Sequence, residues 1–160
     1  MLLTRGTNGF TRELMNYNYV YIPGNVPSAK NSKQRTKFGI IGSKASLRYK
    51  HDIAPIYHSK RKEFQSLLVS HTAPYSIGFH FIRSTRGRFD FNNMTQMVQD
   101  MMVDAHWLED DNVRNMVPFP LMVNERFVSL SKELAGVVIA VVDTPPQFNI
   151  SIDDDRITDY

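Results

Sequence analysis

Apolar and polar residues alternate most regularly along the stretch YSIGFHFI, residues 75–82. The alternation defines two faces, one with Tyr75, Ile77, Phe79 and Phe81 and the other with Ser76, Gly78 and His80. A period of two predicts a β-strand. A shorter alternating pattern predicts a strand at 17–22, and the continuous apolar run VVIAVV predicts a buried strand at 137–142. Further strands are predicted at 38–41, 113–119 and 148–152.

Two other segments repeat apolar residues at helical spacing. The first begins near Ser43 or Ser46, either of which suits an N-cap, and runs towards His71; Pro55 should kink it or split it into two helices. The residues expected to face the core in this helix are Leu47, Ile53, Ile56, Phe64, Leu67 and Leu68. Strands and helices mixed along the chain predict an α+β fold with a small mixed β-sheet and packed helices.

The second helical segment is capped by Asn92 or Asn93 and ends near Ala105. Its apolar stripe consists of Met94, Met97, Val98, Met101, Met102 and Ala105, and its polar side of Asn93, Gln96, Asp100 and Asp104. Methionines at this spacing predict core packing rather than a ligand surface. Trp107, just after the helix, is either a buried anchor or a platform for a nucleic-acid base, and the anchor is the stronger expectation.

The length of 160 residues predicts one domain, which we place at 15–152. Residues 1–14 show no periodicity and are expected to form a flexible tail, and 153–160 an acidic tail. Residues 23–34 contain two prolines and a glycine and predict a loop with exposed lysines. Without an apolar run of about 18 residues, a signal-peptide pattern or a cysteine, the chain is expected in the cytoplasm with no membrane contact.

Charge is divided unevenly along a chain whose net charge is +3. Residues 30–62 carry ten of the nineteen Lys and Arg residues, opposed only by Asp52. Residues 88–111 carry six of the sixteen acidic residues and, after Arg88, no Lys or Arg. Such segments usually form solvated surfaces, but the combination is also typical of a metal-dependent nuclease, in which cations contact phosphates and carboxylates hold the metal.

The acidic segment places carboxylates at both ends of its helix. Asp90 precedes the helix and Asp110 and Asp111 follow it. Because a helix of about 12 residues spans only ~18 Å, both ends could contribute to one site. Asp90 and Asp111 are suitable Mg²⁺ ligands, and Asn92 adds a neutral oxygen. The alternative for each aspartate taken singly is a helix cap or a surface charge.

The sequence FDFNNMTQMVQDMMVDAHWLEDD contains D-x-N-N, a mid-helix aspartate and then W-L-x-D-D. This order resembles the RusA-like Holliday junction resolvases of phage and prophage type, and IPGNVPSAKNSK is similar to the opening strand and loop of that family. The resemblance covers about residues 18–152. It implies an intertwined homodimer that cuts branched DNA in recombination and repair, as an endonuclease using Mg²⁺, for which Mn²⁺ is expected to substitute.

The resemblance also implies roles for individual residues. The implied metal ligands are Asp90, Asn92, Asp100, Asp110 and Asp111, with Asp111 the essential one of its pair. The implied catalytic positions are Asp90, Asp111 and Gln96. Two departures stand out: Asn92 occupies the place of a second aspartate, and Gln96 that of a catalytic lysine. The first removes a negative charge from the metal site and the second removes a cation near the scissile phosphate.

The expected partner is branched DNA. The candidate DNA-binding residues are Lys30, Lys33, Arg35, Lys37, Arg83, Arg86 and Arg88. Two alternatives stay open: a RusA-like DNA-binding protein whose cleavage is weakened or lost through Asn92 and Gln96, and an interaction protein whose acidic helix end docks a basic partner. The sequence contains no glycine-rich phosphate loop and no G-x-S-x-G motif, so no nucleotide cofactor is expected.

Overall fold

The computed structural model describes residues 19–27, 33–36 and 39–143. The predicted tails, the predicted strand at 148–152, and Lys30 and Lys37 lie outside these residues. Among the described residues, no helix is both long and apolar enough to cross a membrane.

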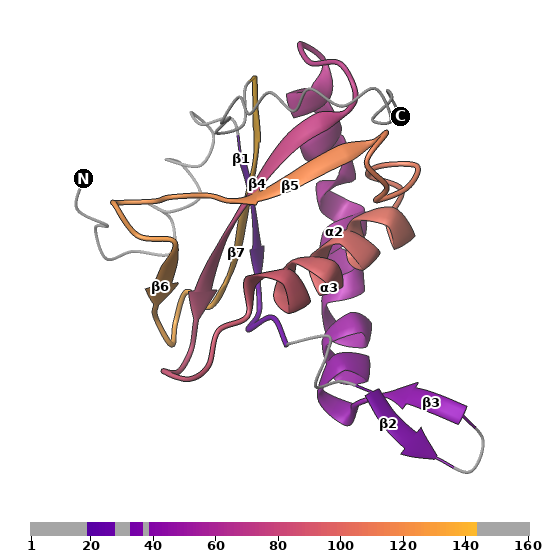
Figure 1. Cartoon of the computed structure of the whole chain (residues 1–160), viewed down its shortest axis with the longest axis vertical. Helices are drawn as coiled ribbons and strands as arrows, with labels where there is room; N and C mark the ends of the chain where they lie inside the picture. Colours follow the sequence, from indigo (N-terminus) through magenta and orange to yellow (C-terminus); the bar gives the residue numbers. More distant parts are fainter. Residues whose placement is uncertain (1–18, 28–32, 37–38, 144–160) are drawn as a thin grey trace, which may run out of the picture.

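Five strands form one mixed sheet (Figure 1). Its order is β1 (Tyr19–Pro23), β7 (Gly136–Val142), β4 (Tyr75–Arg83) and β5 (Met116–Pro120), and β6 (Val128–Leu130) also pairs with β4. β7 runs antiparallel to β1 and β4, whereas β5 and β6 run parallel to β4. The α+β class and the small mixed sheet are therefore confirmed.

The strongest strand predictions are confirmed and the weaker ones need correction. β1 and β4 lie where the alternating patterns placed them, and β7 lies where the continuous apolar run placed it. β5 begins three residues later than predicted and contains Pro118 and Pro120, which an edge strand tolerates because its outer amides need no partner. The short β6 was not predicted.

A second, two-stranded sheet pairs β2 (Lys33–Thr36) with β3 (Gly39–Gly42). It projects from the body of the molecule at the start of α2 (Lys44–Leu68) (Figure 1). β3 agrees with the predicted strand at 38–41, but the assignment of Lys33 and Gln34 to a loop is wrong. Antiparallel pairing with β3 makes this polar segment a strand, although it lacks an apolar period.

α2 begins at the cap predicted for it. The Ser43 hydroxyl accepts a hydrogen bond from the Ser46 amide at 3.2 Å. The prediction that Pro55 could split the helix is wrong, since α2 continues through it as one element of 25 residues. Pro55 is on the exposed side of the helix. Its ring therefore does not disturb the core, although it removes one backbone hydrogen bond and crowds the carbonyl group four residues earlier in the helix.

The core-facing stripe of α2 differs from the predicted one at its start. Leu47 is 50% exposed, whereas Tyr49, Tyr57 and Phe64 are buried. The other predicted residues pack at the edge of the core; they are Ile53, Ile56, Leu67 and Leu68. The positions 49, 53, 57 and 64 share one face of a helix, so the buried tyrosines determine how α2 is turned.

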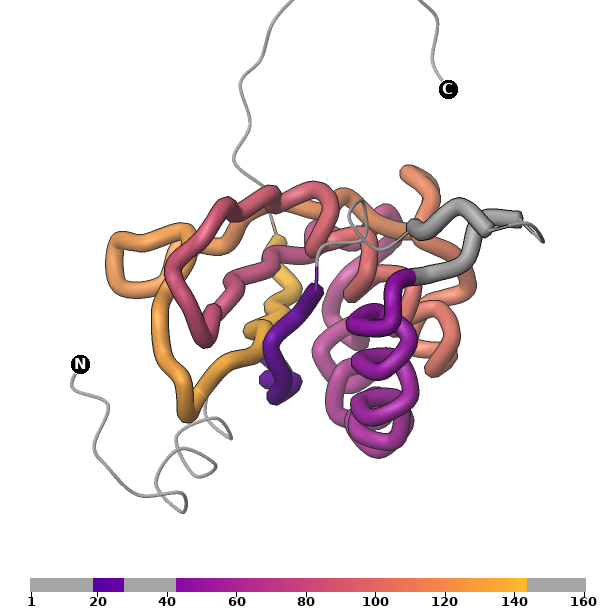
Figure 2. Tube along the Cα trace, turned by 90° about the horizontal axis from the view of Figure 1, so that it is seen from below, coloured from indigo at the N-terminus to yellow at the C-terminus, as the bar shows by residue number. Residues whose placement is uncertain are grey.

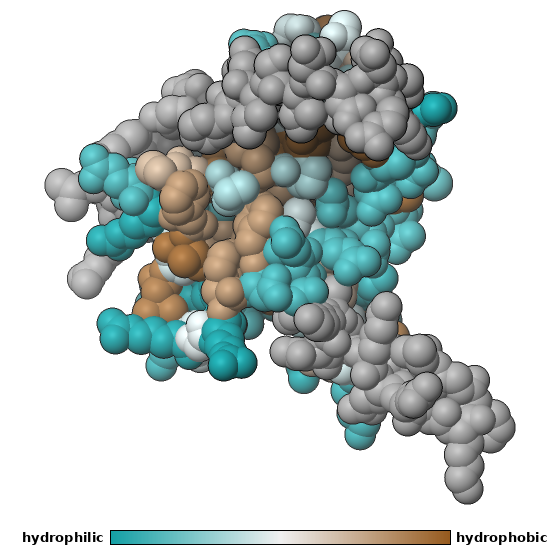
Figure 3. All heavy atoms as spheres, in the orientation of Figure 1, coloured by the Kyte–Doolittle hydropathy of each residue, from teal (hydrophilic) through white to brown (hydrophobic). Residues whose placement is uncertain are grey.

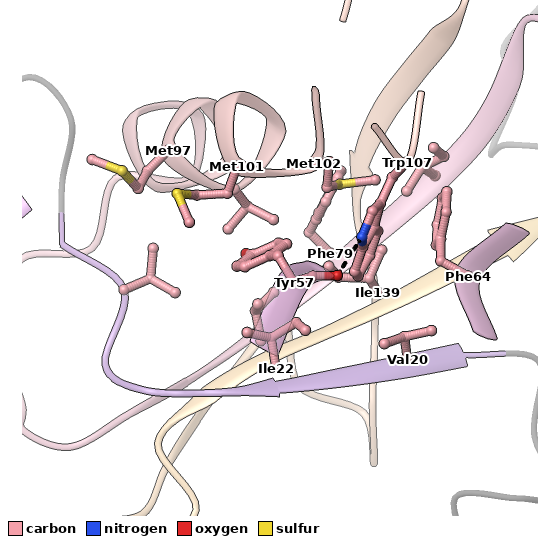
Figure 4. Packing of buried hydrophobic residues seen from close by; sticks show 14 of the residues in the cluster. Val20, Ile22, Tyr57, Phe64, Phe79, Met97, Met101, Met102, Trp107 and Ile139 are labelled. Carbon is pink, nitrogen blue, oxygen red and sulfur yellow. Dashed lines mark hydrogen bonds between the residues drawn. The ribbon is translucent and has the colours of Figure 1, made fainter. Parts of the chain in front are cut away.

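α3 (Phe91–Asp104) buries its whole predicted apolar stripe. α2 and α3 lie on the same side of the sheet (Figure 2). Between them and the sheet lies a core that contains the inward residues of β1, β4 and β7 (Figure 4), namely Val20, Ile22, Ile77, Phe79, Phe81, Val137, Ile139 and Val141. Within residues 19–27, 33–36 and 39–143, the helices cover one face of the sheet.

Trp107 closes the far end of this core (Figure 4). Its ring stacks on Phe64 with centroids 4.7 Å apart, and its Nε1 donates to the Tyr57 carbonyl oxygen at 2.7 Å. The side chain is 2% exposed. Trp107 is therefore the expected buried anchor, and no face of its ring is available to a base.

Residues 116–131, which we call the arm and which include β5 and β6, bring Phe119, Leu121 and Ser129 against the second face of β4. Gly78 permits this contact, because a Cβ at that position would lie 2.8 Å from the Phe119 ring. The arm also exposes apolar side chains (Figure 3), and Met122, Phe127 and Leu130 are each about half exposed. The faces of β4 are thus both buried, by different elements.

His80 fixes the arm to the sheet. Its Nδ1 donates to the Leu121 carbonyl oxygen at 3.0 Å, since a carbonyl only accepts, and its Nε2 then accepts from the Ser129 hydroxyl at 2.8 Å. The neutral ring satisfies both bonds in this way, whereas a protonated ring would donate from Nε2 to the Ser129 hydroxyl oxygen. Burial lowers the pKa of His80 from its ordinary value of 6.5, although the bond to Leu121 opposes that shift.

We expect the stability of the protein to fall in acid because of His80. A lowered pKa in the folded state means that its contribution is fully present above about pH 6.5 and is lost as the pH falls through the lowered pKa. His80→Gln should lower the free energy of unfolding at pH 7 by about 1–3 kcal/mol, through lost hydrogen bonds, and flatten its decline in acid. Urea unfolding from pH 5 to 8 measures both effects. His106→Gln, at an exposed histidine, is the control, and an equally flat profile for that variant would contradict the assignment.

Candidate functional site

The carboxylates of residues 88–111 are divided between the two ends of α3. Asp100, Asp104 and Asp111 line one open pocket of about 160 Å³ together with Lys50 and Val103. Asp90 is not among its lining residues, and the ten residues of chain from Asp90 to Asp100 rise by about 15 Å. The structure therefore brings Asp111 to the second half of α3.

The chain reversal after α3 explains this position. The Trp107 amide donates to the Met102 carbonyl oxygen at 2.8 Å, and His106 adopts a left-handed conformation with φ of 57°. A left-handed residue just after a helix is usually glycine. With Trp107 anchored in the core, the following loop returns along the polar side of α3 and carries Asp111 to the pocket.

Asp104 and Lys50 were not among the site residues predicted from the sequence. Asp104 lies one turn after Asp100 on the polar side of α3, so helical spacing was a signal that could have included it. Lys50 comes from α2, and its ammonium nitrogen lies 3.6 Å from the Asp100 Oδ2. Only the packing of α2 beside α3 brings these residues together, and no sequence pattern indicates it.

The pocket disfavours a charged carboxylate at Asp100. Burial raises the pKa of Asp100, and the neighbouring carboxylates of Asp111 and Asp104 raise it further, while the Lys50 ammonium lowers it. Repulsion among neighbouring carboxylates is relieved when a cation binds between them. The charge distribution is therefore suited to a cation.

Asp110 makes hydrogen bonds within the loop that follows α3. Its Oδ1 accepts from the Asp111 amide at 2.8 Å and its Oδ2 from the Asn112 side chain at 2.7 Å. These hydrogen bonds lower the pKa of Asp110. Asp110 does not line the pocket, so within the acidic pair it is Asp111 that the pocket includes.

Asp90 caps α3, and the prediction of Asn92 or Asn93 as the N-cap is wrong. The Asp90 Oδ1 accepts from the Asn93 amide at 3.2 Å, and its Oδ2 accepts from the Asn93 side chain. A carboxylate at this position also interacts favourably with the helix dipole. Asn92 and Gln96 are exposed. A role of Asp90, Asn92 or Gln96 in metal binding or catalysis stays a prediction.

The predicted basic turn lies between β4 and α3. Arg83 braces it, because its Nη1 donates to the carbonyl oxygens of Gly87 at 3.1 Å and Arg88 at 2.8 Å. The side chains of Arg86 and Arg88 are exposed. Lys33 and Arg35 lie on β2, in the projecting sheet. The described candidate DNA-binding residues thus lie in two regions, the turn before α3 and the projecting sheet, which are separate along the chain and in the fold (Figure 1).

The residues of the pocket that could hold Mg²⁺ are its carboxylates. Within residues 19–27, 33–36 and 39–143, no three histidine or acidic side chains form a ready metal-binding group. Mg²⁺ usually takes only one or two carboxylates and completes its octahedron with water and substrate phosphate. Asp100 and Asp111 provide hard oxygens in one pocket with the required charge, so these two residues fit such an ion.

No family model matches the chain, and no curated protein sequence matches it.

Proposed function

We propose that this protein is a Mg²⁺-dependent endonuclease of the RusA-like kind that acts on branched DNA. The observation that carries the proposal is the pocket in which Asp111, from the loop, lies with Asp100 and Asp104, from α3. The motif order from Asp90 to Asp111 supports it, as do the exposed arginines of the turn before α3.

The role proposed for each residue follows from its position. Asp100 and Asp111 would hold the ion, which when bound supplies positive charge at the scissile phosphate and an activated water. Asp104 is exposed at the rim of the same pocket and can accept the proton of an attacking water. Arg86 and Arg88 would bind the phosphates of the DNA backbone.

A second copy of the chain is part of the proposal. A four-way junction has two-fold symmetry, and symmetrical cleavage needs two active sites related by a two-fold axis. Light scattering of the free protein and of its junction complex would show whether two chains are present.

The second candidate function is binding of branched DNA without efficient cleavage. The capping role of Asp90 favours it, because both carboxylate oxygens are engaged by Asn93 and not directed to the pocket with Asp111. Asn92 and Gln96 add no charge that could compensate. Incubating a labelled four-way junction with Mg²⁺ or Mn²⁺ separates the two: an enzyme yields paired nicks, and a binding protein yields a stable complex.

We expect DNA binding to depend steeply on salt. Each phosphate contact contributes about 0.9 to the slope of log K against log salt. Replacing both Arg86 and Arg88 with glutamine should lower the slope by about 2 for junction DNA. The matched control removes the same charge from the exposed side of α2, with Arg61→Gln and Lys62→Gln. Fluorescence anisotropy at several salt concentrations gives the slopes. Equal losses in the two double variants would show that the turn before α3 is not a binding surface.

A further inference from the structure

Lys50 lies opposite α3, on the neighbouring helix. Its ammonium nitrogen is 3.6 Å from the Asp100 Oδ2, and the two side chains are 38% and 42% exposed. Lys50 lines the acidic pocket and also an adjoining pocket of about 200 Å³ between α2 and α3. Asp104 is the other residue common to both pockets.

The Lys50 ion pair differs from the others that α2 makes. The pairs of Arg48 with Asp52 and of Lys60 with Glu63 lie within the helix. Among the described residues, the pair of Lys50 with Asp100 is the one that joins α2 to another element by charge. It therefore cannot be explained as local support of the helix.

The charges of the pocket are not balanced by Lys50. The pocket is lined by one ammonium group and by three carboxylates, those of Asp100, Asp104 and Asp111, and of these the ammonium group pairs with Asp100. An added divalent cation would balance the remaining charge, but it would repel an ammonium held at the same carboxylate. The lysine side chain is long, flexible and partly exposed, and the adjoining pocket offers it space.

We propose that the ammonium group of Lys50 neutralises Asp100 in the metal-free protein. When a divalent ion binds, this ammonium group moves away from Asp100 and contacts a substrate phosphate. This inference rests on the proposed function. Lys50 then competes with the metal in the free protein and contributes a phosphate contact in the complex. It also keeps the carboxylates together before the metal arrives.

The test uses the full chain with Lys50→Met and Lys50→Arg. The control is Lys44→Met, which removes the same charge from an exposed position of α2 outside both pockets. Mn²⁺ affinity is measured by calorimetry without DNA, and junction affinity by anisotropy in Ca²⁺. Lys50→Met should bind Mn²⁺ roughly two- to fivefold more tightly at low salt, and the gain should shrink in high salt. It should also bind the junction more weakly, whereas Lys50→Arg should resemble the wild type in both measurements.

Three outcomes are decisive. Tighter Mn²⁺ binding together with weaker DNA binding supports the proposal. Unchanged or weaker Mn²⁺ binding in Lys50→Met overturns it and makes the ion pair a purely structural contact. If Asp111→Asn binds Mn²⁺ as the wild type does, the metal site itself is wrong and the proposed function fails with it. Should Lys50→Met not fold, Lys50→Gln gives the same comparison with a polar side chain.

Discussion

Replacing Asp111 with asparagine should lower the Mg²⁺-dependent cleavage of a four-way junction by at least about 100-fold, because a metal ligand supplies several kcal/mol of transition-state stabilisation. The fold should survive, since Asp111 is exposed in a loop. DNA binding should be unchanged or stronger, because a negative charge that repels phosphate is removed. Single-turnover cleavage and anisotropy in Ca²⁺ measure the two effects separately.

The neighbouring Asp110→Asn is the matched control. Asp110 is occupied by the loop and does not line the pocket, so its loss should reduce cleavage much less. Equal losses at both positions would mean that loop geometry, and not metal ligation, explains the result.

Asp90→Asn resolves the role of the capping residue. Asparagine is as good an N-cap as aspartate, so α3 should keep its start and the protein its stability. Loss of cleavage in that variant would therefore report a metal-binding role, which the sequence resemblance implies. Cleavage at the wild-type rate would leave Asp90 with the capping role alone.

The largest effect on stability is expected for Met97→Asp. Met97 is 2% exposed within the core between α3 and the sheet (Figure 4). An unpaired carboxylate there loses its hydration without gaining a partner, which costs several kcal/mol and is comparable to the whole stability of a small domain. We expect an unfolded protein, or a urea midpoint far below that of the wild type.

Gln96→Asp provides the control for this substitution. It adds the same charge one residue earlier, at an exposed position, and should change the free energy of unfolding by no more than about 0.5 kcal/mol. A stable, cooperatively folded Met97→Asp protein would mean that α3 is turned differently from the orientation described above.

The elements that the sequence predicted well are those whose own residues carry a regular period. The alternation in β4 and the methionine stripe of α3 are local patterns, and each has the period of one element type. The continuous apolar run of β7 was equally informative, because a strand inside a sheet has no polar face. In α2 the apolar pattern was ambiguous. Packing against the sheet buries Tyr49 and leaves Leu47 half exposed.

The candidate acidic residues were identified from the sequence, but their grouping was not. The length of the helix allowed Asp90 and Asp111 to contribute to one site. In the structure, Asp90 instead caps α3. The left-handed conformation of His106 and the buried Trp107 direct the following loop, with Asp111, towards Asp100. The sequence around His106 and Trp107 does not predict this chain reversal, because the residue that usually indicates one after a helix is glycine. Lys50 joins the pocket through helix packing alone. Residue types and periods thus determined which elements form and which side chains are polar. The tertiary contacts of the core decided which of those side chains share a pocket, because distances between elements depend on packing that no local pattern encodes.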